Sequence, residues 1–120
     1  MRIYLSGPMS NLPLYNFPAF DAAAAELRAA GHTVFNPAEA DRLKGFDPVA
    51  LTSDGTDAAL HGFSLREALK EDLSWICDHA EAVALLPGWA KSKGALTEVN
   101  LATALDIPFA RHTHFLKEQS

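Results

Sequence analysis

The chain has 120 residues, a length typical of one domain, and its 48% of apolar residues suits an ordinary globular protein. Its net charge of -5 argues against broad electrostatic binding to a nucleic-acid polymer or to an anionic membrane. A single cysteine and the lack of a long apolar run argue against an internal disulfide, an export signal or a membrane span, so a cytoplasmic protein is expected.

The first third of the chain alternates between strand and helix patterns. Residues 2–6 (RIYLS) predict a buried strand that runs into a Gly-Pro turn. Residues 17–30 predict a helix that starts at Asn16 as N-cap and ends at Gly31. One apolar face of this helix consists of Phe17, Phe20, Ala24 and Leu27. Residues 32–36 (HTVFN) predict a second short strand, which a proline ends.

The middle of the chain interrupts this rhythm. Residues 38–62 are rich in Asp, Gly and Pro and show no sustained period. We interpret them as a loop insertion, a lid or an interface segment with room for one helical turn, because so long a loop in a small domain is usually functional or mobile. Ser64 and Glu67 then form a capping box that starts a helix ending near His79. On that helix, Cys77 is expected to be a packed apolar side chain rather than a reactive thiol.

The last third returns to alternation. Residues 82–86 (AVALL) predict a strand, residues 94–105 a helix and residues 107–110 a last short strand, followed by a polar tail over 111–120. The order βα, β-loop-α, βα, β predicts a parallel sheet with helices on both faces. We therefore expect one α/β domain over residues 1–120, a Rossmann-like or flavodoxin-like three-layer fold with strand order 2-1-3-4.

The loop after the first predicted strand is the first candidate site. It comprises Ser6, Gly7, Pro8, Met9, Ser10 and Asn11. Small residues let backbone N–H groups approach a ligand, and hydroxyl groups can donate to phosphate or sugar oxygens. The spacing matches neither a dinucleotide fingerprint nor a Walker A loop, and a plain βα turn also contains Gly and Pro. Ligand binding and simple chain reversal both remain open.

Asp72 is the second candidate because it interrupts an apolar helix face. That face consists of Leu65, Ala68, Leu69, Trp75 and Ile76. A buried unpaired charge is costly, so a carboxylate at such a position usually has a reason. The reason is either function or a structural role in a buried salt bridge or a cap to a neighbouring loop.

Glu98 is the third candidate, on the inner side of the helix over 94–105. Its neighbours one turn away are Ala95, Leu101 and Ala102. It follows a strand and a Pro-Gly turn, and so lies near the carboxyl end of a strand, where open α/β sheets bind ligands. The helix dipole favours its ionised form, which suits a nucleophile, and the helix start with Ser92 and Gly94 can hold an anion. The alternative is an ordinary first-turn glutamate.

Two carboxylates aimed at one sheet edge suit glycosyl chemistry, in which one group attacks or stabilises an anomeric carbon and the other handles protons. Tyr4 and Trp89 either stack on a base or pack in the core. Lys91 and Lys93 either help to hold a phosphate or are solvated. The five histidines show no metal-ligand spacing, and we expect neither a metal nor a cofactor.

Four motifs in order, IYLSGPM, HTVFNP, EDLSWICDHAEAVALLPG and GALTEVNLATAL, resemble the nucleoside 2-deoxyribosyltransferase-like superfamily. The resemblance runs from Arg2 to about Phe109 and is notable for the small phage and bacterial members grouped as DUF4406. It implies that Glu98 is the nucleophile and that Asp72 and Tyr4 take part in catalysis. It also implies that Ser6, Gly7 and Pro8 bind the ligand.

Departures from the family pattern refine this expectation. The true transferases carry an Asp six positions before the nucleophile, where this chain has Ser92. The similar 2′-deoxynucleoside 5′-monophosphate N-glycosidases carry a Ser there, which contacts the phosphate, so the resemblance favours hydrolysis of a nucleotide. Their first loop contains an Arg that Met9-Ser10-Asn11 lacks, and the second family Asp is Glu81 here. Recognition of a phosphate is therefore not implied.

The resemblance implies cleavage of the N-glycosidic bond of a (deoxy)nucleoside or its 5′-monophosphate through a ribosyl-enzyme on Glu98, by hydrolysis or base transfer. One alternative is a non-catalytic nucleotide-binding or sensing module, and another is an NAD-type glycohydrolase. Small members of the family pair through helices, so we expect a homodimer with the tail or the 38–62 loop at its interface. The expected setting is the cytoplasm of a bacterium or of a phage-infected bacterium.

Overall fold

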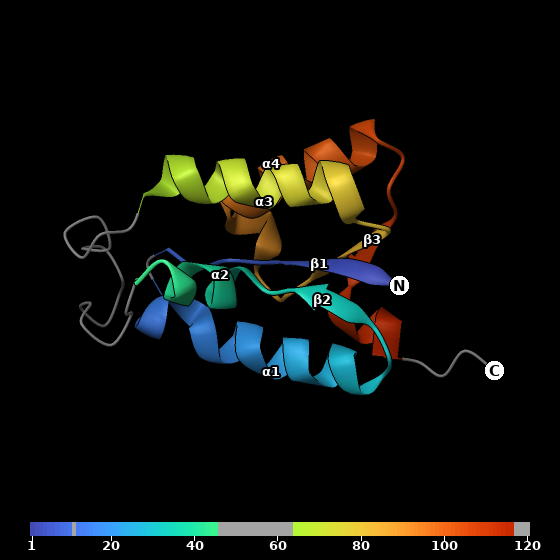
Figure 1. The fold of residues 1–120 in the computed structure, drawn as a ribbon, viewed down its shortest axis with the longest axis horizontal. Coiled ribbons are helices and arrows are strands. Elements are labelled where there is room, and N and C mark those ends of the chain that lie inside the picture. The colour runs from blue at the N-terminus through green and yellow to red at the C-terminus, as the bar shows by residue number, and fades with distance from the viewer. Residues whose placement is uncertain (11, 46–63, 117–120) are drawn as a thin grey trace.

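The computed structural model describes residues 1–10, 12–45 and 64–116 (Figure 1). Asn11 and most of the predicted 38–62 loop, with its expected role as a lid or interface segment, lie outside the described residues.

Four strands form one parallel sheet in the order β2-β1-β3-β4. They are β1 (Arg2–Ser6), β2 (Thr33–Phe35), β3 (Ala82–Leu85) and β4 (Phe109–Arg111). The predicted strand order 2-1-3-4 and the α/β class are confirmed. Since β1 and β3 lie in the centre, their carboxyl ends meet in the middle of one sheet edge, where open α/β sheets bind ligands.

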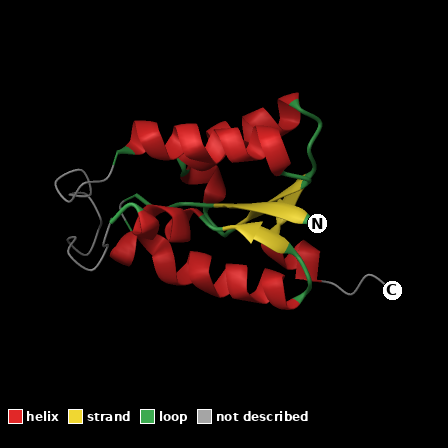
Figure 2. Cartoon of the chain, viewed as in Figure 1, coloured by secondary structure: helices red, strands yellow, loops and turns green. Residues whose placement is uncertain are grey.

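Within the described residues, four α-helices cover the sheet: α1 (Phe17–Ala29), α2 (Pro37–Leu43), α3 (Leu65–His79) and α4 (Lys93–Ala104). Helices α3 and α4 lie on one face and α1 on the other, which gives the predicted three layers (Figures 1 and 2). Short 3-10 helices occupy Pro13–Asn16, Trp89–Lys91 and His112–Leu116. In the part of the chain that the structure describes, no helix is both long and apolar enough to cross a membrane.

The alternation of side chains along β1 decides which residues meet which helices. Ile3 and Leu5 pack in the core between the sheet and α1. Tyr4 lies in the second core, on the side of α3 and α4, with Ile76 and Val99. Ser6 has the same phase as Tyr4, so both of their hydroxyl groups can reach α4.

Helix α2 differs from the loop that the sequence predicted after Pro37. The Asn36 side chain caps this seven-residue helix by accepting a hydrogen bond from the Ala38 N–H at 3.0 Å. Proline follows the cap directly, where its missing N–H costs nothing. An ion pair of 2.7 Å between Arg42 and Asp21 ties α2 to α1. The Asn-Pro signal that ends β2 therefore also starts a helix.

Three further expectations are wrong in detail. The last strand is Phe109–Arg111 rather than 107–110, and the residues that follow are not simply a polar tail. His112–Leu116 forms a 3-10 helix whose Phe115 is buried against the core beside α1. Cys77 is exposed rather than packed, because it lies on the outer face of α3.

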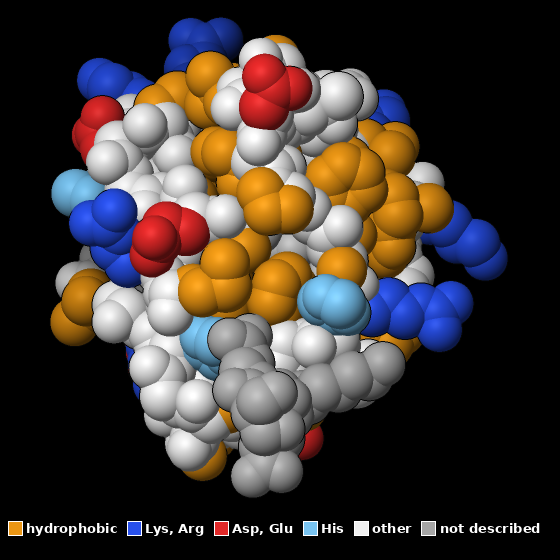
Figure 3. All heavy atoms as spheres, turned by 90° about the vertical axis from the view of Figure 1, so that its right-hand side faces the viewer, with side chains coloured by type: hydrophobic (Ala, Val, Ile, Leu, Met, Phe, Trp, Pro, Cys, Tyr) orange, Lys and Arg blue, Asp and Glu red, His pale blue; other side chains and the backbone are white. Residues whose placement is uncertain are grey.

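Apolar side chains gather among scattered charged groups on the face that carries the N-terminus and the starts of the strands (Figure 3). The carboxyl ends of the strands lie at the opposite end of the molecule (Figure 1), where the candidate polar residues meet.

Candidate functional site

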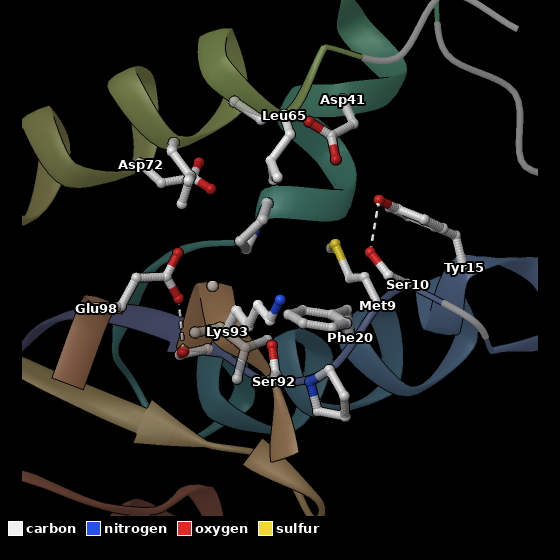
Figure 4. A pocket seen from close by; sticks show the side chains of 18 of the residues that line it. Met9, Ser10, Tyr15, Phe20, Asp41, Leu65, Asp72, Ser92, Lys93 and Glu98 are labelled. Carbon is white, nitrogen blue, oxygen red and sulfur yellow. Dashed lines mark hydrogen bonds between the residues drawn. The ribbon is translucent and has the colours of Figure 1, made fainter. Parts of the chain in front are cut away.

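A cavity of about 360 Å³ lies beyond the carboxyl end of β1 (Figure 4). Its wall comes from the end of β1 and the loop after it, from the Pro13–Asn16 helix and α1, from the helix α2, from the first turns of α3 and from the start of α4. The volume is within the usual range for sites that bind small molecules. The crossover connections of a parallel sheet thus bring these separate segments to one place.

Glu98 is a buried polar side chain of the cavity, with an exposed fraction of only 5%. The Tyr4 hydroxyl donates a hydrogen bond of 2.7 Å to its Oε2, and the Ser6 hydroxyl donates one of 2.6 Å to its Oε1. Ser92 caps the same helix by accepting from the Ala95 N–H at 3.2 Å. Both carboxylate oxygens are therefore held in place, while the helix that carries them is anchored at its start.

Tyr4 is fully buried, and aromatic rings fix its position. Its ring stacks on Phe35 with centroids 5.5 Å apart and lies 6.4 Å from the ring of Trp75. Only two χ angles orient the hydroxyl, and packing restricts both. The Tyr4 ring therefore packs between aromatic side chains, while its hydroxyl group contacts Glu98.

Burial raises the pKa of Glu98 to about 7, although the hydrogen bonds from Ser6 and Tyr4 favour the carboxylate and act in the opposite direction. The sequence suggested that the helix dipole would favour the ionised form. In the structure the loss of hydration outweighs that effect. Near neutral pH both protonation states of Glu98 are populated.

Asp72 reaches the cavity from α3 with an exposed fraction of 8%. Burial, followed by the negative charge of Glu98, raises the pKa of Asp72 to about 8, and hydrogen bonding with Tyr4 offsets part of this rise. The sequence left open a buried salt bridge, but none of the ion pairs between described residues includes Asp72. At neutral pH Asp72 is mostly a neutral acid that can donate a proton.

The loop after β1 borders the cavity with Ser6, Gly7, Pro8, Met9 and Ser10. A side chain at Gly7 would place its Cβ 2.7 Å from the Cβ of Leu86, so glycine is required there by packing against the end of β3. Asn16 occupies the N-cap position of α1 as predicted, but its side chain makes no capping hydrogen bond and its amide donates to the Pro8 carbonyl at 2.7 Å. That bond braces the loop from the start of α1.

The remaining sequence candidates divide between two places. Lys91, Ser92, Lys93 and Gly94 line the same cavity as Glu98. Trp89 does not: it borders a separate cavity beside Arg111 and His112, and its ring contacts Phe109 edge-on at 6.5 Å. Among the described residues, no group of three or more His, Cys, Asp or Glu side chains could hold a metal ion.

Asp41 and Tyr15 are cavity residues that the sequence did not single out. Asp41 lies on α2, which was predicted as part of a loop. A signal was present, since a helix beginning at Pro37 places Ala38 and Asp41 on one face, three residues apart.

A model of the DUF4406 family, described as a domain of unknown function, matches residues 1–110. All residues that line the cavity fall within this range. No curated protein sequence matches the chain.

Proposed function

Because the chain belongs to the DUF4406 family, whose description states no activity, we propose from its site that it cleaves the N-glycosidic bond of a (deoxy)nucleoside or its 5′-monophosphate. One observation carries most of this proposal. Glu98 and Asp72 are two buried carboxyl groups in one cavity, and their pKa values are raised to different extents. Such a separation is typical of an acid and a base or nucleophile working together.

In the proposed first step, a carboxylate oxygen of Glu98 bonds to C1′ of the sugar while the bond from C1′ to the base nitrogen breaks. The electron pair of the broken bond goes to the base, and the Asp72 carboxyl supplies the proton that the base needs. In the second step a water molecule bonds to C1′, gives its proton to the Asp72 carboxylate and releases Glu98. A second base in place of water would give transfer.

The mechanism requires ionised Glu98 and protonated Asp72 at the same time. Glu98 is ionised above about pH 7 and Asp72 is protonated below about pH 8. The two conditions overlap near neutral pH, which supports assigning the nucleophile to Glu98 rather than to Asp72. Activity should therefore follow a bell-shaped pH profile.

The N-terminus of α4, where Ser92 is the N-cap, suits the binding of a sugar or phosphate oxygen. The Ser92 hydroxyl oxygen already accepts a bond from the Ala95 N–H, so its own proton is available to a ligand. Lys91 and Lys93 also line this part of the cavity and would favour an anion. A cavity of about 360 Å³ favours a mononucleoside or mononucleotide over a dinucleotide such as NAD.

The proposal is tested by incubating the purified protein with deoxynucleosides, their 5′-monophosphates, ribonucleotides and NAD, and by following free base by chromatography. Base released from one class of substrate would support the proposal and define that class. Attachment of an added second base would identify transfer. Thermal stabilisation by a nucleotide without any release of base would instead identify a binding module.

Replacing Tyr4 by Phe should shift the acid side of the pH profile upwards. The Tyr4 hydroxyl stabilises the carboxylate form of Glu98, so its removal raises the pKa of Glu98 further and a higher pH is needed to ionise it. The measurement is kcat/KM against pH. Tyr15→Phe is the matched control, because Tyr15 lines the cavity but its hydroxyl contacts Ser10 rather than Glu98. An unshifted profile in Tyr4→Phe would contradict this role of the Tyr4 hydroxyl.

A further inference from the structure

Asp41 is a third carboxyl group in the cavity, and the proposed reaction gives it no part. It lies in the second turn of α2, lines the cavity and has an exposed fraction of 5% (Figure 4). Burial raises its pKa to about 6, with the charge of nearby Lys44 acting in the opposite direction. At neutral pH it is therefore mainly a carboxylate that can only accept hydrogen bonds.

No side chain among the described residues donates a hydrogen bond to this carboxylate. Lys44 is engaged with Glu71 instead, at 2.7 Å. A carboxylate that is more than nine-tenths buried keeps little hydration, and without a protein donor its ionised form is poorly stabilised. Its acceptor oxygens are thus available to a donor that enters the cavity.

The space in front of Asp41 has apolar walls. The side chains of Met9 and Phe20 lie across the cavity from Leu65, and Ala68 and Leu69 continue the wall of α3 (Figure 4). Flat aromatic rings suit such a space, since both of their faces are apolar and their polar atoms lie at the edge. The Asp41 carboxylate would face the edge of an aromatic ring that binds in this space.

In Figure 4, Asp72 and Glu98 lie on one side of Leu65 and Asp41 lies on the other. Burial, followed by the negative charges of Glu98 and Asp41, raises the pKa of Asp72. A leaving base whose glycosidic nitrogen is protonated by Asp72 therefore extends away from Glu98, and its far edge faces Asp41.

Resting on the proposed function, we propose that Asp41 selects a base with an exocyclic amino group at this edge. The amino group at C4 of cytosine or at C6 of adenine can donate to the carboxylate. A carbonyl at the same position, as in uracil, thymine or hypoxanthine, presents an oxygen to an oxygen, and the neighbouring ring N–H reaches the carboxylate only if the base shifts in the cavity. Sites built around one buried polar group reject analogues that lack the matching partner strongly.

The test uses pairs of substrates that differ only in this group: 2′-deoxycytidine against 2′-deoxyuridine and 2′-deoxyadenosine against 2′-deoxyinosine, each also as its 5′-monophosphate. Turnover is compared in the unmodified protein, and binding is compared by calorimetry in Glu98→Gln. We expect at least about a tenfold preference for the amino-bearing member of each pair. The substitution Asp41→Asn, made in both of these proteins, should reduce or reverse this preference, because an amide can donate as well as accept.

Asp78→Asn is the matched control, since it makes the same change of acid to amide at an exposed aspartate of α3 that does not line the cavity. This variant should keep the preference. Thermal melting of each variant verifies the fold. Equal turnover and equal binding of the two members of each pair would overturn the inference. A preference that persists in Asp41→Asn would also overturn it, as would the failure of all of these substrates to bind. Selective binding without release of base would overturn the proposed reaction and leave the selection by Asp41 supported.

Discussion

Replacing Glu98 by Gln is expected to lower kcat/KM by about 10³-fold or more, which corresponds to roughly 4 kcal/mol of transition-state stabilisation. The amide has nearly the shape of the carboxylate, so it can stay between the hydroxyl groups of Tyr4 and Ser6. It cannot form the ester with C1′. The reaction should therefore fail at its first step in a protein that remains folded.

Release of free base measures this loss, and intact-mass spectrometry examines its cause. A slow substrate should add the mass of one sugar unit to the unmodified protein and none to Glu98→Gln. Glu67→Gln is the control, because Glu67 is an exposed glutamate in the first turn of α3 and does not line the cavity. Undiminished turnover in Glu98→Gln would rule out the ribosyl-enzyme.

Replacing Asp72 by Asn should stabilise the fold at alkaline pH while it impairs the reaction. The folded state raises the pKa of Asp72 from 3.8 to about 8, so it binds a proton that the unfolded chain has already released across that range. The free energy of unfolding therefore decreases as pH rises from about 4 to about 8. An amide does not titrate, so the stability of the variant lacks this dependence on pH. At pH 9 its free energy of unfolding should exceed that of the unmodified protein by at least about 2 kcal/mol, and at pH 4 the two values should be nearly equal.

Chemical denaturation at pH 4 and at pH 9 measures this difference. Asp78→Asn is the control on the same helix, because Asp78 is exposed and does not line the cavity. It should show no comparable gain at pH 9. Equal stability of Asp72→Asn and the unmodified protein at pH 9 would mean that Asp72 carries no buried charge, and the assignment of Asp72 as the acid would then lack its basis.

The sequence was sufficient to predict the sheet and the position of Glu98, because strong local patterns determine both. The strands β1 and β3 are short continuous apolar runs, and α4 has a serine cap and an inward glutamate on an apolar face. Strand order then follows from the parallel alternation of strands and helices and from their right-handed crossovers.

Other features could not be predicted, because they depend on geometry that pattern does not encode. The partners of Glu98 come from β1, more than ninety residues earlier, and only the sheet register brings them together. Gly88 adopts φ +86, and the turn that it makes places Trp89 beside β4 instead of in the main cavity. Asp41 was missed because seven residues of helix do not produce a sustained period.

The two hydroxyl groups that hold Glu98 lie two residues apart on one strand, in the sequence Tyr4-Leu5-Ser6. Natural selection therefore acts on these two residues and the distant glutamate together. Once the glutamate is lost, the buried hydroxyl groups of Tyr4 and Ser6 lose the acceptor of their present hydrogen bonds, which lowers the benefit of keeping a polar group at either position, so apolar residues should replace them in the descendants. We expect relatives that keep both the Tyr-x-Ser strand and the helical Glu to keep these two hydrogen bonds, and relatives that lack the Glu to have lost the Tyr-x-Ser pattern as well.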